Sequence, residues 1–157
     1  WLATPSEDDQ STDNWLRLAA CMPSAAIGRV CERLLFAKDT AEAMIATSKL
    51  MEDMDAILDG KSSEITFQLE QFPLAAVETL HDLITPGQHK RILNQFLTTW
   101  RHITTASNGG TLIQMGLRPG PQFKTILGRL RAARIDGEVD ESGENGLLRK
   151  LIAEVNE

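Results

Sequence analysis

The residues best suited to chemistry lie in one stretch, a turn rich in proline and glycine that is followed by basic side chains. The turn is Leu117-Arg118-Pro119-Gly120-Pro121. A proline at a helix start loses no hydrogen bond, because the first N–H groups of a helix have no partner within it. Those N–H groups lie at the positive end of the helix dipole and bind anions readily. The sequence predicts a phosphate site here: Gly120 has no side chain to block the ligand, the donors are Gln122 and Phe123, and the Gly120 N–H is a third candidate.

Two predicted helices must position this turn. A short helix over 111–115 stops at Gly116, which can take the left-handed conformation at no steric cost. A longer helix over 120–134 follows, and on it Lys124 and Arg131, seven residues apart, share one side. The pattern is similar to helix-hairpin-helix elements, which hold a nucleic-acid backbone without reading its bases. A tight turn with solvated basic residues is the alternative that the pattern leaves open.

The charge of −6 is unevenly distributed along the chain. Residues 1–85 carry 6 Lys/Arg and 15 Asp/Glu, whereas residues 86–136 carry 8 Lys/Arg and one acid, Asp136. Residues 137–157 carry 2 Lys/Arg and 6 acids. A cationic block within an acidic chain is typical of a surface that binds phosphates. The other interpretation is that these cations pair with acids of the same molecule.

Helix signals follow one another along the rest of the sequence, without a convincing strand. The predicted fold is therefore an all-α bundle of roughly nine helices with no sheet. Residues 1–10 are polar and acidic and are interpreted as a disordered linker remnant. Pro86-Gly87 separates a predicted helical body subdomain, 11–85, from a helical tail subdomain, 87–157.

The longest early helix shows the clearest local signals. Asp39 and Glu42 predict a capping box at its start, and Gly60 is expected to end it. Its apolar stripe, Leu50 to Leu58, has the period of a helix. Besides the two helices around the turn, the predicted helices cover residues 12–21, 23–35, 39–59, 63–71, 73–84, 88–104 and 142–155.

Length and composition exclude some classes of protein. The 157 residues, with 42% hydrophobic and 24% charged, are ordinary for a soluble globular protein. No apolar run approaches the roughly 20 residues needed to span a bilayer. The chain opens with Trp1 rather than Met, and we expect it to be a piece of a longer protein. Cys21 and Cys31 lack metal-ligand spacing and are predicted to be two buried thiols in a reducing cytoplasm.

No motif in the sequence is complete enough to predict a catalytic site. Asp53-Met54-Asp55 falls within a predicted helix, where its carboxylates point in different directions, and is interpreted as a solvated face. His81-Asp82 resembles the dyad of metal-dependent phosphohydrolases, but the upstream histidine of such a site is absent. No Gly-x-Ser-x-Gly elbow supports a serine nucleophile. The methionines at 44, 51 and 54 are expected to fill the core.

Residues 97–139 contain, in order, Trp100-Arg101-His102, a glycine-containing turn, the sequence Gly116-x-x-Pro119-Gly120-Pro121 and a helix that ends before Asp136-Gly137. In this order the segment resembles the C-terminal part of bacterial tRNA nucleotidyltransferases and poly(A) polymerases. The helices over 13–85, including Arg33-Leu34, resemble the helical body of that family more loosely. The sequence departs from the family at Gly110-Thr111-Leu112, where an acid often stands, and at Ile135, which replaces a commoner Leu. The residues at matching places are Trp100, Arg101, His102, Gly110, Leu112, Gly116, Pro119, Gly120, Pro121, Leu127, Leu130, Ala133, Asp136 and Gly137.

The resemblance implies a non-catalytic, cytoplasmic RNA-binding region. In that family an N-terminal head domain transfers nucleotides with Mg²⁺ and a nucleoside triphosphate, so neither catalysis nor a cofactor or metal is expected of this chain. The implied partners are tRNA or another structured RNA, bound through its phosphates, and the head domain of the same parent chain. The predicted RNA-binding residues are Arg101, His102, Arg118, Gly120, Lys124, Arg129 and Arg131. The alternative is a helical protein–protein or dimerisation module, which predicts an exposed apolar patch on residues 39–59 or 88–104.

Overall fold

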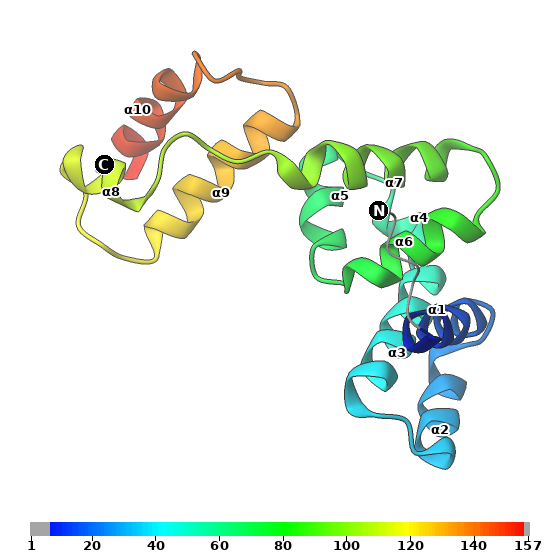
Figure 1. The fold of residues 1–157 in the computed structure, drawn as a ribbon. Coiled ribbons are helices and arrows are strands. Elements are labelled where there is room, and N and C mark those ends of the chain that lie inside the picture. Colours follow the sequence, from blue (N-terminus) through cyan, green and yellow to red (C-terminus); the bar gives the residue numbers. More distant parts are fainter. Residues whose placement is uncertain (1–6, 156–157) are drawn as a thin grey trace. The chain divides into compact units, whose positions relative to one another are not determined.

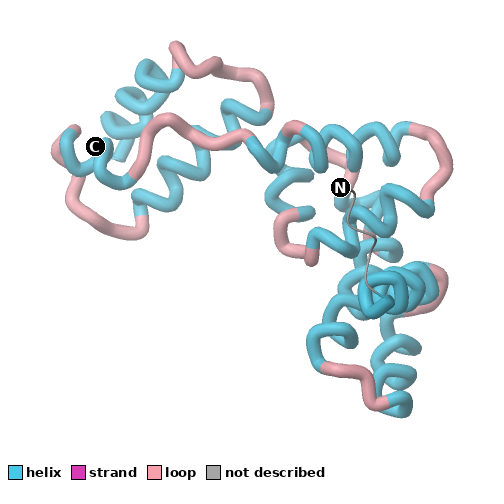
Figure 2. Tube along the Cα trace, viewed as in Figure 1, coloured by secondary structure: helices cyan, strands magenta, loops and turns pink. Residues whose placement is uncertain are grey.

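The computed structural model describes residues 7–155, and these form ten α-helices and one 3₁₀-helix with no strand (Figures 1 and 2). The all-α prediction is confirmed. No helix in this part of the chain is long and apolar enough to cross a membrane. The elements are α1 (Glu7–Ala20), α2 (Ser24–Leu34), α3 (Lys38–Glu52), α4 (Met54–Ile57), α5 (Ser62–Leu69), α6 (Leu74–Leu83), α7 (Gln88–Thr98), η1 (Trp100–His102), α8 (Gly109–Gln114), α9 (Gln122–Ile135) and α10 (Glu144–Val155).

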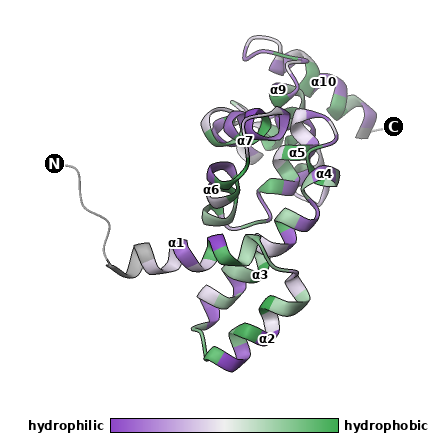
Figure 3. Ribbon diagram, turned by 90° about the vertical axis from the view of Figure 1, so that its right-hand side faces the viewer, coloured by the Kyte–Doolittle hydropathy of each residue, from purple (hydrophilic) through white to green (hydrophobic). Residues whose placement is uncertain are grey.

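The chain divides into two compact units. The first unit comprises Trp1–Gly60 and Phe67–Leu97, and the second comprises Lys61–Thr66 and Thr98–Glu157. The sequence placed a boundary at Pro86-Gly87, but α7 belongs to the first unit and lies beside α6 (Figures 1 and 3). A proline–glycine pair ends a helix, but it does not by itself separate two cores.

The first unit is built around α3, which packs against α1, α2 and α6. Figure 3 shows that hydrophobic and hydrophilic residues alternate along α1, α2 and α3, as expected of helices with one buried face. The rings of Trp15 and Phe36 meet edge to face, with centroids 4.9 Å apart. Both rings pack against a hydrophobic core cluster of the first unit, whose buried residues are Leu16, Ala19, Ile27, Cys31 and Met44.

Helix boundaries in this unit differ from the prediction at both ends of α3. The predicted capping box is wrong: α3 begins after Ala37 without a side-chain cap, and Glu42 pairs with Lys38 at 3.7 Å. The predicted helix over 39–59 is interrupted at Asp53, whose φ and ψ are −95° and 4°. Its last helical residue is Ile57, so Gly60 does not directly follow a helix.

Other expectations for this unit are met in part. Leu50, Ile57 and Leu58 are buried as predicted, but Met51 of the same stripe is 40% exposed. Cys31 is buried, which raises the pKa of its thiol, whereas Cys21 lies in the turn after α1 and is exposed. The expectation of two buried thiols is therefore wrong for Cys21. Of the predicted linker remnant, residues 1–6 lie outside the described residues, and residues 7–10 belong to α1.

Leu35 ends α2 in a conformation that favours glycine. Its φ and ψ are 54° and 42°, and its side chain is 87% exposed, so little burial offsets the strain. We expect Leu35→Gly to raise the free energy of unfolding by about 0.5–1 kcal/mol, because the left-handed conformation costs a Leu roughly 1–2 kcal/mol and part of that gain is offset by the unfolded-state entropy of glycine. Urea denaturation measures it. Leu34→Gly, one residue earlier and still helical, should instead destabilise the protein by about 0.5–1 kcal/mol.

The second unit has its own core between α8, α9 and α10, which lie together in Figure 1. Asn108 accepts hydrogen bonds from the N–H groups of Gly110 and Thr111, and the Thr111 hydroxyl accepts one from Asn108 N–H, which completes a capping box for α8. The core consists of Leu112, Leu117, Ile126, Leu130, Leu148 and Ile152.

Candidate nucleic-acid interface

The first part of the turn between α8 and α9, at Gly116, has the predicted left-handed conformation. Gly116 takes a φ of +93°, as predicted. Its N–H donates to the Ile113 carbonyl at 2.9 Å, and the Leu117 N–H donates to the Leu112 carbonyl at 3.1 Å. These two bonds form a Schellman motif, in which the residue after the glycine packs back on the helix. Leu117 and Leu112 are both buried, so the turn is anchored to the core of the second unit.

The start of α9 differs from the prediction. The helix begins at Gln122, two residues later than expected. The Phe123 N–H donates to the Gly120 carbonyl at 3.0 Å, so the prediction that it is a free donor is wrong. The cause is a tight turn with i→i+3 bonds, since Lys124 N–H likewise donates to Pro121 at 3.1 Å. Within residues 7–155, the N–H groups of Gly120 and Gln122 have no acceptor.

The space beside Gly120 is occupied by a side chain that the sequence did not single out. The Gln122 amide donates from Nε2 to the Arg118 carbonyl at 3.0 Å. A Cβ atom added to Gly120 would lie 2.4 Å from Gln122 Oε1. The glycine is therefore needed for this fold-back of Gln122. A phosphate that approaches Gly120 must move a flexible amide, which can itself donate to a phosphate oxygen.

The predicted cations of α9 fall into two groups. Arg118 and Lys124, at the start of the helix, are exposed and have no acidic partner in the described part of the chain. Towards its end, Arg129 Nη2 pairs with Glu138 at 2.6 Å. Arg131 Nε donates to the Ile103 carbonyl at 2.9 Å and is half-buried. Arg129 and Arg131 therefore have partners within the protein towards the end of α9, whereas Arg118 and Lys124, before and at its start, have no acidic partner within residues 7–155.

The long helix predicted over 88–104 ends before Arg101 and His102. The helix ends at Thr98, Thr99 leaves the helical region with φ −131° and ψ −64°, and the two residues form the end of η1. Two adjacent threonines explain the break, because their branched, hydroxyl-bearing side chains disfavour helix interiors. Arg101 is half-buried and His102 is exposed. The bond from Arg131 to Ile103 places the residue after η1 against α9.

A buried ion pair that the sequence did not reveal holds this unit in shape. Glu144, 1% exposed, accepts hydrogen bonds from the N–H groups of Ala106 at 3.1 Å and Ser107 at 2.8 Å. Arg134 Nη1 lies 3.1 Å from the same carboxylate. Burial acts to raise the pKa of Glu144, but the hydrogen bonds from Ser107, Ala106 and Arg134 outweigh it and lower that pKa. The carboxylate therefore fixes the segment that leads into α8, and with it the α8–α9 turn.

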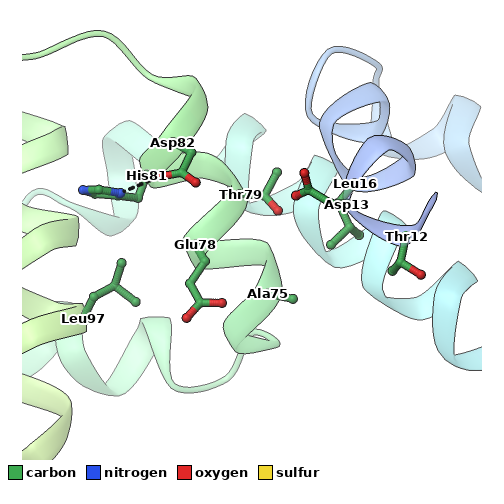
Figure 4. Close-up of a pocket in the computed structure, with 9 residues that line it drawn as sticks. All are labelled: Thr12, Asp13, Leu16, Ala75, Glu78, Thr79, His81, Asp82 and Leu97. Carbon is green, nitrogen blue, oxygen red and sulfur yellow. Dashed lines mark hydrogen bonds and ion pairs between the residues drawn. The ribbon is translucent and has the colours of Figure 1, made fainter. Parts of the chain in front are cut away.

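The groups rejected as catalytic lie in the first unit. His81 Nδ1 is 3.1 Å from Asp82 Oδ1, and both line a pocket of about 480 Å³ between α1, α6 and Leu97 (Figure 4). Asp13 and Glu78 also line this pocket, yet no group of three or more His, Cys, Asp or Glu in the described chain has metal-binding geometry. Asp55 is solvated, its side chain 90% exposed and 3.6 Å from His89.

No family model matches this sequence, and no curated protein or solved structure is significantly similar to it.

Proposed function

We propose that this chain binds structured RNA, with tRNA as the expected partner, through phosphates at the α8–α9 turn. It would act as the non-catalytic C-terminal region of a cytoplasmic tRNA nucleotidyltransferase-like protein. The main support comes from two exposed cations without an acidic partner in the described chain, Arg118 and Lys124. Between them in sequence lie Gly120 and Gln122, whose backbone N–H groups have no acceptor among the described residues. Side-chain charge and backbone donors together suit a phosphate.

The geometry narrows the proposed interface to the start of α9. Arg129 forms an ion pair with Glu138, and Arg131 donates a hydrogen bond to the Ile103 carbonyl. These two cations therefore stabilise the second unit and are less available to a phosphate. Arg101 and His102 in η1 form a second, smaller contribution beside Ile103. Binding of this kind is sensitive to salt and indifferent to base sequence, because phosphates carry no base identity.

Such a surface would position RNA rather than transform it. The resemblance of residues 97–139 to nucleotidyltransferases suggests that the RNA 3′ end is presented to a head domain, to which Mg²⁺ and the nucleoside triphosphate would belong. Firm positioning matters there, because a misplacement of about 1 Å can lower a rate roughly 100-fold.

The double variant Arg118→Glu/Lys124→Glu tests the proposal. We expect its affinity for tRNA to fall at least about tenfold, and the slope of log affinity against log salt to fall by about 0.9 for each phosphate that the variant no longer neutralises. Fluorescence anisotropy with labelled tRNA at salt concentrations from about 50 to about 200 mM NaCl measures both quantities. Arg131 is left intact, because replacing it would also break its bond to Ile103.

The matched control is Arg149→Glu/Lys150→Glu on α10. Both residues are exposed cations of the same unit and have no acidic partner among residues 7–155, so the net charge changes equally. If the two double variants lose affinity equally, the α8–α9 turn is not the interface. If the unaltered protein binds no RNA, the proposed function fails altogether.

The alternative function, a protein–protein or dimerisation module, requires a continuous apolar surface. On α3, Ile45 and Met51 are 38% and 40% exposed, but they are six positions apart, which places them about 120° apart around the helix. On α7 the apolar side chains are buried or half-buried. The exposed apolar side chains of α3 therefore lie on different sides of that helix, and sedimentation with and without tRNA measures self-association directly.

A further inference from the structure

A second feature, in the first unit, has the chemistry of a ligand site. A pocket of about 670 Å³ lies between the Pro86-Gly87 turn, His81 of α6 and the first turns of α7. We call it the α7 pocket. None of the described residues that line it is acidic, although acids outnumber bases 14 to 7 in this unit. Two of those 7 bases, Lys90 and Arg91, line this one pocket.

Arg91, Lys90 and Gln95 have hydrogen-bond donors available for a ligand. Arg91 is exposed and has no acidic partner within residues 7–155. Lys90 Nζ makes one long bond, 3.3 Å, to the Ile84 carbonyl, and an ammonium group has two further donors. Gln95 is exposed, and its amide both donates and accepts. The sequence of α7 contains no acid, so nothing on the helix itself repels an anion.

The pocket has room for a ligand larger than an inorganic anion. Pockets of about 300–1,000 Å³ hold organic molecules, usually with a few polar groups that fix the orientation of the ligand. Two adjacent cations suit a phosphate group, and an amide suits the mixed donors and acceptors of a base edge. His81 also lines the pocket, and Asp82 holds its ring through Nδ1.

We propose that the α7 pocket binds a nucleotide, with its phosphate at Lys90 and Arg91 and its base near Gln95. The nucleotide is either a free mononucleotide or an unpaired nucleotide of an RNA, since the two share this chemistry. The inference goes beyond the proposed function, because the pocket lies in the other unit and needs no RNA at the α8–α9 turn.

The test compares AMP, adenosine, inorganic phosphate and a short oligoadenylate RNA by isothermal titration calorimetry at low salt. We expect the unaltered protein to bind AMP or the oligonucleotide more tightly than adenosine or phosphate. Arg91→Glu should weaken this binding about tenfold or more, through loss of a charge-assisted hydrogen bond and added repulsion. The control, Arg29→Glu, changes an exposed cation of the same unit that lines no part of the pocket, and should weaken it less than about twofold.

Each outcome decides the proposal. Binding of AMP that disappears in Arg91→Glu supports a mononucleotide site, and binding of the oligonucleotide alone, abolished in the same variant, supports an unpaired RNA nucleotide. Equal affinity for AMP and inorganic phosphate, equal effects of the two variants, or no binding of AMP and oligonucleotide would overturn it. Arg118→Glu/Lys124→Glu should leave AMP binding unchanged, which separates this result from the proposed function.

Discussion

Glu144→Ala is expected to destabilise the second unit by about 3–5 kcal/mol, the range seen when one partner of a buried ion pair is removed. The variant leaves Arg134, whose side chain is 20% exposed, without its counter-ion. It also leaves the N–H groups of Ala106 and Ser107 without their acceptor. Because these residues lead into α8, the change should loosen the α8–α9 turn as well as the core.

Hydrogen exchange measures this effect unit by unit. Protection of the amides of α8, α9 and α10 should fall, while that of α1 and α3 in the first unit should change little. Glu141→Ala is the matched control, since Glu141 is exposed and has no partner within residues 7–155. Similar protection in the two variants would show that the buried pair does not stabilise this unit.

The same carboxylate gives the second unit a dependence on pH. The pKa of Glu144 is lowered on folding, so its stabilisation is fully present above the unfolded value of about 4.3 and is lost as the pH falls through the lower folded pKa. Stability of α8–α10 should therefore decline below about pH 4.3, and Glu144→Gln should remove this part of the decline. Thermal denaturation of the unaltered protein and of Glu144→Gln across this pH range measures the difference.

Local signals explain which parts of the fold could be predicted from the sequence. Pro73 precedes α6, and Gly116 ends the α8 segment, because these residues act through their own backbone geometry. The buried face of α9 is a local signal of the same kind, since Ile126 and Leu130 are four residues apart and both are buried. The helix breaks at Asp53 and Thr99 were missed, because neither a glycine nor a proline marks them.

At the candidate site, local signals predict the position of a residue in a turn or helix but not the residue that it contacts. The sequence placed Arg118 and Lys124 correctly at a turn and the start of a helix, both local features. It could not show that Arg129 meets Glu138, nine residues away, because the Asp136-Gly137 turn brings them together. A count of charges therefore overstates the cations that are free for a ligand.

Carboxylates from distant parts of the chain also accept hydrogen bonds in the first turns of two helices. Glu52 accepts from the Ser24 N–H and hydroxyl, each at 2.8 Å, at the start of α2. Asp136 does the same for Ser63, at 2.8 Å to the N–H and 2.7 Å to the hydroxyl, in the first turn of α5. The two pairs are 28 and 73 residues apart in sequence, so no local pattern predicts them.

Asp136→Ala is accordingly expected to lower the free energy of unfolding by about 2–3 kcal/mol, because the buried Ser63 loses both bonds to a charged acceptor. Glu52→Ala removes the same pair of bonds at an exposed site, where water replaces the carboxylate, and should lower the free energy of unfolding by less than Asp136→Ala does. Urea denaturation of both variants and of Ser63→Ala, with the Asp136→Ala/Ser63→Ala double variant, gives the coupling energy. A coupling near zero would mean that Asp136 acts only within its own turn. A large coupling would show that this aspartate, one of the residues on which the family resemblance depends, has a folding role separate from any contact with RNA.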